Sequence, residues 1–331
     1  MIQRIFMKFN FKPLLILTSL ATVSFADIAA TTQDIRAFVL PEDTVTVQGS
    51  YLRTSDAVDF LNLNGKAVAG DIYSGLDDSS GMDISLGYGL HQFVSLYYNF
   101  EALNINYAGS SIENRKNELF ARVNFYDTPH YTFDAFSLDI GYIQNSADDF
   151  NNLSDLSDNS YYMRLLIGSK FTSSLLNFYT GAKYSSITTT LNATNIDRDE
   201  RTLMAGISYT QEMFSNYILD ANYEYMRMVG RDGGLGDNKS NHTVNIHLSR
   251  AFSEDFLLYI GTKIMLNQFN GAIPYLYNTQ TQSSFDKKYS LIKAGFVYNF
   301  DMSEKNNKNK VFTAPAFPEK KSTSLFSFFG W

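Results

Sequence analysis

Several features that define common protein classes are missing from this sequence of 331 residues. It has no cysteine, which excludes disulfides, thiolate metal sites and lipid attachment through an N-terminal cysteine. Its 6 prolines and 20 glycines are too few for a collagen-like or a Pro/Gly-rich disordered chain. Charged residues make up 18%, against about 25% in ordinary soluble domains, and the formal net charge is −7. The acidic balance argues against nucleic-acid binding, which normally needs a basic surface.

The sequence also lacks long apolar runs beyond residue 26. A helical membrane protein needs spans of about 20 apolar residues, and the runs here are only a few residues long. Residues 1–26 follow the pattern of a secretory signal peptide: three basic residues, the short apolar segment 14–23, and the small residues Ser24 and Ala26 at a cleavage site. We therefore expect export, with a mature chain that begins at Asp27.

Most of the remaining chain alternates apolar and polar residues with a period of two. In 82–90 apolar residues occupy every second position, and after a turn at His91 the pattern resumes over 94–101. A period of two indicates strands with one apolar and one polar face. The pattern recurs as far as residue 300 and predicts about twelve strands between residues 44 and 300.

The links between these segments alternate in length. The short links lie at 91–92, 127–131, 172–174, 211–216 and 253–255. The long links lie at 54–80, 108–116, 144–159, 188–200, 229–239 and 268–286. Short turns at one end and long loops at the other are typical of an outer-membrane barrel, whereas a soluble β-sandwich gives no reason for such alternation.

The predicted fold is therefore all-β: a transmembrane antiparallel up-and-down β-barrel with short periplasmic turns and long extracellular loops. In such a barrel the apolar side chains face lipid and the polar side chains face the lumen. The first long link contains Asn64-Gly65 between apolar runs, which is a hairpin signal. If that hairpin inserts into the sheet, the barrel has about fourteen strands instead of about twelve.

The last alternating segment, 289–300, ends with Phe296, Tyr298 and Phe300. It resembles the terminal-strand signal of the Gram-negative outer-membrane β-barrel (porin-like) superfamily, in which the assembly machinery reads an alternating strand that ends in Phe. The resemblance implies a place in the bacterial outer membrane, with the barrel-assembly machinery, outer-membrane lipids and lipopolysaccharide as partners. That signal usually ends the chain, whereas here 301–331 follow. We expect 301–331 to be a periplasmic tail and 27–43 a periplasmic N-terminal segment.

Charged residues also occur at the predicted inward positions, five of them acidic and five basic. They are Asp83, Glu101, Arg122, Asp139, Arg164, Lys183, Asp220, Glu224, Lys263 and Lys293. A belt of charges near the middle of a membrane is costly unless it is paired or hydrated. The belt therefore either lines a narrow aqueous pore or closes it with salt bridges. We expect a basic excess at Lys183 and on the side of Lys263 and Lys293, facing Asp83 and Glu101.

Three functions fit this pattern. The first is a narrow channel for small hydrophilic or charged solutes, and the second is a structural or surface-interaction barrel with a closed lumen. The third is an outer-membrane lipid hydrolase with Ser240, His242 and Gln268 on the lipid face. Outer-membrane phospholipases use His-x-Ser, the reverse of the order here, so we do not expect an enzyme. No phosphate loop or metal signature occurs, so no cofactor or metal is expected. Both a monomer and a porin-like trimer fit the pattern.

Overall fold

The computed structural model describes eleven ranges of the chain. They are 37–55, 80–107, 110–127, 133–149, 154–171, 173–191, 194–213, 216–231, 239–253, 255–267 and 287–302. The expected signal peptide, the hairpin at Asn64-Gly65, Gln268 and almost all of the tail 301–331 lie outside these ranges. Across the ranges that are described, no helix has the length and apolar character needed to cross a membrane.

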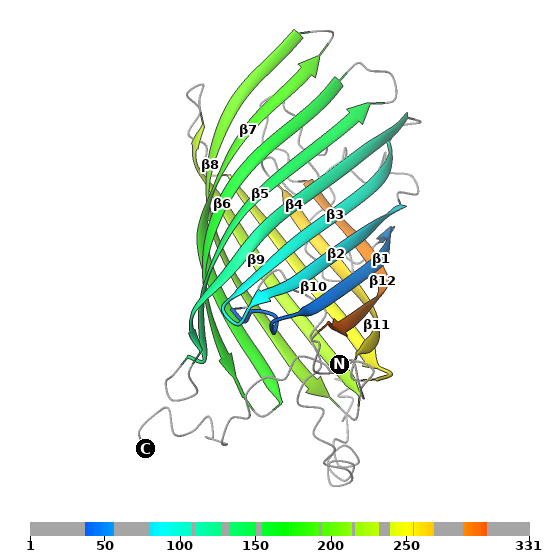
Figure 1. Ribbon diagram of the computed structural model, residues 1–331. Helices are drawn as coiled ribbons and strands as arrows, with labels where there is room; N and C mark the ends of the chain where they lie inside the picture. The colour runs from blue at the N-terminus through cyan, green and yellow to red at the C-terminus, as the bar shows by residue number, and fades with distance from the viewer. Residues whose placement is uncertain are drawn as a thin grey trace, which may run out of the picture.

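The described residues form twelve strands in one closed antiparallel barrel (Figure 1). The strands are β1 (Thr44–Ser55), β2 (Ser80–His91), β3 (Val94–Tyr107), β4 (Ser110–Asp127), β5 (Ala135–Asp149), β6 (Ser154–Lys170), β7 (Ser174–Leu191), β8 (Thr194–Met213), β9 (Tyr217–Arg231), β10 (Ser240–Ala251), β11 (Phe256–Asn267) and β12 (Lys287–Asp301). Each strand pairs with its neighbours in the sequence, and β1 closes the ring against β12 with Val45 opposite Phe300. Closure leaves no strand edge unpaired, as a membrane-spanning sheet requires.

The prediction of an antiparallel up-and-down barrel with about twelve strands is confirmed. Because β1 pairs directly with β2, the segment 56–79 adds no strand between them. The alternative of about fourteen strands is therefore wrong.

The period of two in the sequence becomes the two faces of the barrel wall. Leu119, Ile140 and Tyr161 point outward and are 57–61% exposed. Phe120 and Tyr162, their neighbours in the chain, point inward and are at most 5% exposed. Large apolar side chains on the outside are stable when lipid surrounds them, and the polar residues are turned toward the lumen.

The strands extend further than the sequence pattern indicated. The predicted loops 108–116, 144–159 and 188–200 are mostly strand, so that β3–β4, β5–β6 and β7–β8 are joined only by 108–109, 150–153 and 192–193. In Figure 1, strands β5–β8 rise well above β1 and β2 at this end of the barrel, the long-loop end. The polar residues of these extensions still form main-chain hydrogen bonds with the neighbouring strand. A strand that continues past a bilayer needs no apolar outer face. The sequence pattern therefore misses these extensions.

Candidate functional site: the barrel lumen

The chain folds back into the lumen just before β1. Asp43 has a positive φ of 61° and turns the chain, and its N–H donates to the Gly89 carbonyl at 2.8 Å. The preceding residues Ala37–Pro41, here called the plug segment, cross the lumen at the end opposite the long loops, the short-turn end. The plug segment belongs to the stretch 27–43 that we expected outside the barrel, and 27–36 lies outside the described ranges.

Hydrogen bonds tie the plug segment to four strands of the barrel, from β3 to β7. The Leu40 N–H donates to Ser95 Oγ on β3 at 2.7 Å, and the Ala37 N–H donates to Asn177 Oδ1 on β7 at 3.1 Å. The Ser137 hydroxyl on β5 donates to the Ala37 carbonyl, and Arg122 on β4 donates to the Phe38 carbonyl at 3.5 Å. The plug segment therefore spans the lumen.

Two glycines make room for this segment. Gly89 on β2 lies so close to the Pro41 carbonyl that any side chain there would overlap with it. Gly168 on β6 lies against Phe38 and Ala37, where an added Cβ would be 2.9 Å from the Ala37 Cβ. The barrel wall is thus shaped to hold the plug segment at both of its ends.

A packed layer of charges and rings lies against the plug segment. Arg122 donates to both oxygens of Asp139, at 2.7 and 2.9 Å, and Arg164 Nη2 lies 3.0 Å from Asp139 Oδ2. The Arg122 guanidinium also faces the rings of Tyr97 and Phe120. Arg122 and Asp139 are 0% exposed. Wall residues of an open pore would contact water, so the lumen is filled at this level.

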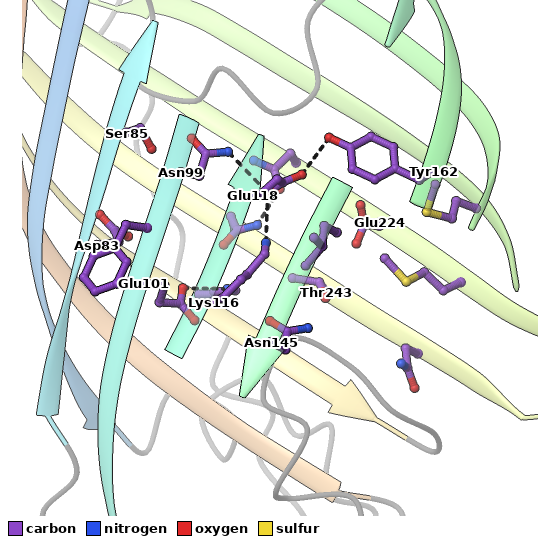
Figure 2. A pocket seen from close by; sticks show the side chains of 18 of the residues that line it. Asp83, Ser85, Asn99, Glu101, Lys116, Glu118, Asn145, Tyr162, Glu224 and Thr243 are labelled. Carbon is purple, nitrogen blue, oxygen red and sulfur yellow. Dashed lines mark hydrogen bonds and ion pairs between the residues drawn. The ribbon is translucent and has the colours of Figure 1, made fainter. Parts of the chain in front are cut away.

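A chamber of about 170 Å³ adjoins this layer on its long-loop side. Most of the residues that line it are polar, and Figure 2 shows many of them. Glu118 accepts hydrogen bonds from Tyr162 at 2.7 Å and Asn99 at 3.3 Å, and Lys116 Nζ lies 3.0 Å from the same carboxylate (Figure 2). A chamber of this size can hold several water molecules or one small organic solute.

Two further ion pairs cross the chamber. Lys293 Nζ lies 2.5 Å from Asp83 Oδ2, and Lys263 Nζ lies 3.3 Å from Glu101 Oε2. The second pair joins β11 to β3, with β12, β1 and β2 between them in the ring, so it narrows the lumen. Lys263 and Lys293 were expected to face Glu101 and Asp83, and they do so closely enough to form ion pairs. These pairs neutralise the basic excess that we expected on that side.

Lys183 and Glu224 differ from the other charged residues of the chamber. Lys183 on β7 is 7% exposed and makes no hydrogen bond or ion pair with any residue of the described ranges. Glu224 on β9 accepts a hydrogen bond from the Tyr179 hydroxyl. Lys183 is therefore the one lysine of the chamber wall that lies against no described carboxylate.

All ten charged residues predicted to point inward lie on the lumen side of the wall. Arg122, Asp139 and Arg164 form the packed layer, and Asp220 accepts a hydrogen bond from Thr210 at 2.6 Å. Besides Arg164, six of them line the chamber: Asp83, Glu101, Lys183, Glu224, Lys263 and Lys293. Their role in selectivity stays a prediction.

The sequence reasoning missed several residues of the site. Lys116 and Glu118 have the inward parity of β4, but Lys116 lies in the link that we predicted at 108–116 and Glu118 was not among the predicted inward residues. His247 on β10 also lines the chamber, with its ring 5.4 Å from that of Tyr259. The plug segment could not be found by periodicity, because it belongs to no strand.

Two other predicted groups lie on the outer face. Ser240 Oγ is 3.1 Å from His242 Nε2, and His242 Nδ1 is 2.8 Å from the Tyr223 hydroxyl. Phe296 is exposed on the outside of β12, and the rings of Tyr298 and Phe300 meet at 4.4 Å. The role of these three in assembly stays a prediction. Within the described ranges, no three His, Asp or Glu side chains are placed to share a metal ion.

No protein-family model and no curated protein matches the sequence. Solved structures are similar to it. An outer-membrane channel from Pseudomonas putida F1 is 12% identical, with a TM-score of 0.51 over 82% of this chain and 100% of that chain. The translocator domain of autotransporter NalP from Neisseria meningitidis is 12% identical (TM-score 0.43, covering 77% and 87%), and the NanC porin is 11% identical (TM-score 0.43, covering 77% and 98%). Identity at this level shows the fold alone, and the fold of this chain is that of an outer-membrane β-barrel.

Proposed function

We propose that the protein is a narrow outer-membrane channel for small hydrophilic or charged solutes, which the plug segment closes at its short-turn end. In this proposal the short turns lie in the periplasm and the long loops face outward. The observation that carries it is the chamber, a space of about 170 Å³ lined by charged side chains inside a barrel. A chamber with a charged wall suits the passage of water and small polar solutes.

The way in which the lumen is filled favours a channel over a purely structural barrel. A small barrel of about eight strands can fill its interior with side chains of its own strands. Here part of the filling comes from a segment that contributes no strand and is tied to the wall by a few hydrogen bonds. Such a segment can leave the lumen without breaking the sheet. Its departure, together with a rearrangement of the packed layer beside it, would open the short-turn end of the chamber.

Single-channel recording in planar bilayers tests this function. We expect purified, folded protein to show small, mildly ion-selective openings separated by long closures. A variant that lacks 27–41 should conduct for most of the recording. If neither protein conducts while both migrate as folded barrels on a gel, the structural barrel with a closed lumen is the better account.

Hydrolysis of lipid esters is a second candidate, favoured by one observation. Ser240, His242 and Tyr223 form a chain of hydrogen-bonding groups on the outer face, which matches a nucleophile, a general base and a group that orients the base. A fluorophosphonate probe should then label Ser240 in the folded protein, and His242→Ala should abolish the labelling. Absence of labelling in the wild type would remove this candidate.

A further inference from the structure

Three of the four lysines that line the chamber are neutralised by a neighbouring carboxylate. Lys293, Lys263 and Lys116 lie 2.5–3.3 Å from carboxylate oxygens. Lys183 is buried and faces the same chamber, yet it has no such neighbour among the described residues. The residues opposite it on the flanking strands are Tyr162 and Thr202, and neither supplies a negative charge at neutral pH.

An ammonium group in this position is costly. Removal of an ion from water carries a penalty of several kcal/mol unless an opposite charge compensates for it. In the packed layer and at the other lysines, the barrel itself supplies the opposite charge. At Lys183 it leaves an open chamber instead, so the compensating anion can come from solution.

A second cation strengthens the positive potential on this part of the wall. Arg164 on β6 lies opposite Gly181, two residues from Lys183 on β7, so the two cations are diagonal neighbours on one face. The single carboxylate of Asp139 is shared between Arg164 and Arg122. Arg164 Nε is buried without a hydrogen-bond partner. Lys183 and Arg164 thus place two cations beside this part of the chamber, and an anion would be attracted to them.

The rest of the chamber limits the charge of that anion. Asp83, Glu101 and Glu118 already neutralise lysines, and Glu224 adds a carboxylate whose described partner is the neutral Tyr179. A solute with two negative charges would bring its second charge close to these carboxylates. A solute with one carboxylate and a neutral remainder meets no such repulsion, and the chamber holds only a small molecule.

We propose that the chamber is a binding site for small organic monocarboxylates, whose carboxylate takes the place of the missing partner at Lys183 Nζ. The proposal rests on the proposed channel function, since it names the class of solute that the lumen would admit. It is distinct from that function in one respect, because binding can be measured without conduction.

Propionate binding to the full-length protein in detergent micelles tests the proposal. Saturation-transfer NMR should show saturable binding to the wild type, and propionamide, the neutral analogue, should not compete. Lys183→Gln should weaken propionate binding about tenfold or more, because a charge-assisted hydrogen bond is lost. The matched control is Arg201→Gln, which removes an equal charge from the exposed outer face of β8, outside the chamber. It should leave the affinity within about threefold.

Thermal stability gives a second test that does not depend on measuring the affinity for propionate. If Lys183 is uncompensated, then Lys183→Met should raise the temperature at which the folded band disappears, and propionate should raise it for the wild type alone. The proposal is overturned if the wild type shows no saturable binding, if propionamide competes equally, or if Lys183→Gln and Arg201→Gln lose affinity to the same extent. Binding without conduction would keep the site and remove the channel, and conduction without binding would do the reverse.

Discussion

Removal of two of the hydrogen bonds between the plug segment and the barrel wall should make the plug segment leave the lumen more often than in the wild type. The four hydrogen bonds between this segment and the wall contribute about 2–6 kcal/mol. Burial of Phe38 and Leu40 adds about 3–6 kcal/mol. Ordering the five residues Ala37–Pro41 costs about 5–10 kcal/mol of backbone entropy. The two sides nearly cancel, so the plug segment is held by only a few kcal/mol and small losses should open the channel.

The double substitution Ser95→Ala and Asn177→Ala removes the acceptors of two of these bonds. At about 1 kcal/mol each, the loss should shift the balance between closed and open states about 30-fold. The assay is the open probability of single channels in planar bilayers, measured at one voltage and one salt concentration.

Asn177 also donates to Ser208 Oγ at 3.1 Å, so its replacement disturbs more than the plug segment. Ser208→Ala is the matched control, since it breaks that bond and leaves the plug segment untouched. An unchanged open probability in the double variant would refute the reasoning, and so would an equal rise in Ser208→Ala.

Three other outcomes are expected. Replacement of Phe296, Tyr298 and Phe300 by serine should prevent insertion, because it removes the outward apolar end of β12, and the protein should then lose its heat-modifiable migration; normal migration would show that the assembly signal lies elsewhere. Asp139→Asn leaves two buried guanidiniums without their carboxylate and should destabilise the barrel by about 3–5 kcal/mol in urea titrations, whereas a loss below about 1 kcal/mol would mean that this layer is well hydrated. Protease added to intact cells should spare 301–331, and cleavage there would reverse the proposed orientation.

The strands of the barrel could be predicted because the alternation of apolar and polar residues can be recognised within a short stretch of sequence. A period of two assigns each residue to the lipid or the lumen side, so the inward position of residues such as Asp139 and Arg164 follows from parity alone. The alternation of short and long links then indicates which ends of the strands meet. The same alternation did not predict the strand extensions beyond residues 144 and 188. Their polar residues belong to the sheet, but they have no apolar outer face that would give a period of two.

The alternation of residues tells which side chains face the lumen, but it does not tell which of them contact one another. The pairing of Lys263 with Glu101 needs the order and stagger of the whole closed sheet, since three strands separate the two. The plug segment depends on the backbone turn at Asp43 and on the space at Gly89 and Gly168, which form no pattern in the sequence. That Lys183 has no carboxylate beside it among the described residues becomes visible only when the ion pairs of the other chamber lysines are known.

Reversible locking of the plug segment tests the central claim most directly. The chain has no cysteine, so Ala37→Cys with Gly168→Cys introduces the only thiols. A Cβ at residue 168 would lie 2.9 Å from that of Ala37, and a shift of less than about 1 Å gives the separation that a disulfide spans. We expect the oxidised protein to stay closed in a planar bilayer and to begin conducting when a reductant is added, while the single variant Ala37→Cys ignores the reductant. Equal conductance before and after reduction, with the disulfide shown to have formed, would contradict closure by this segment.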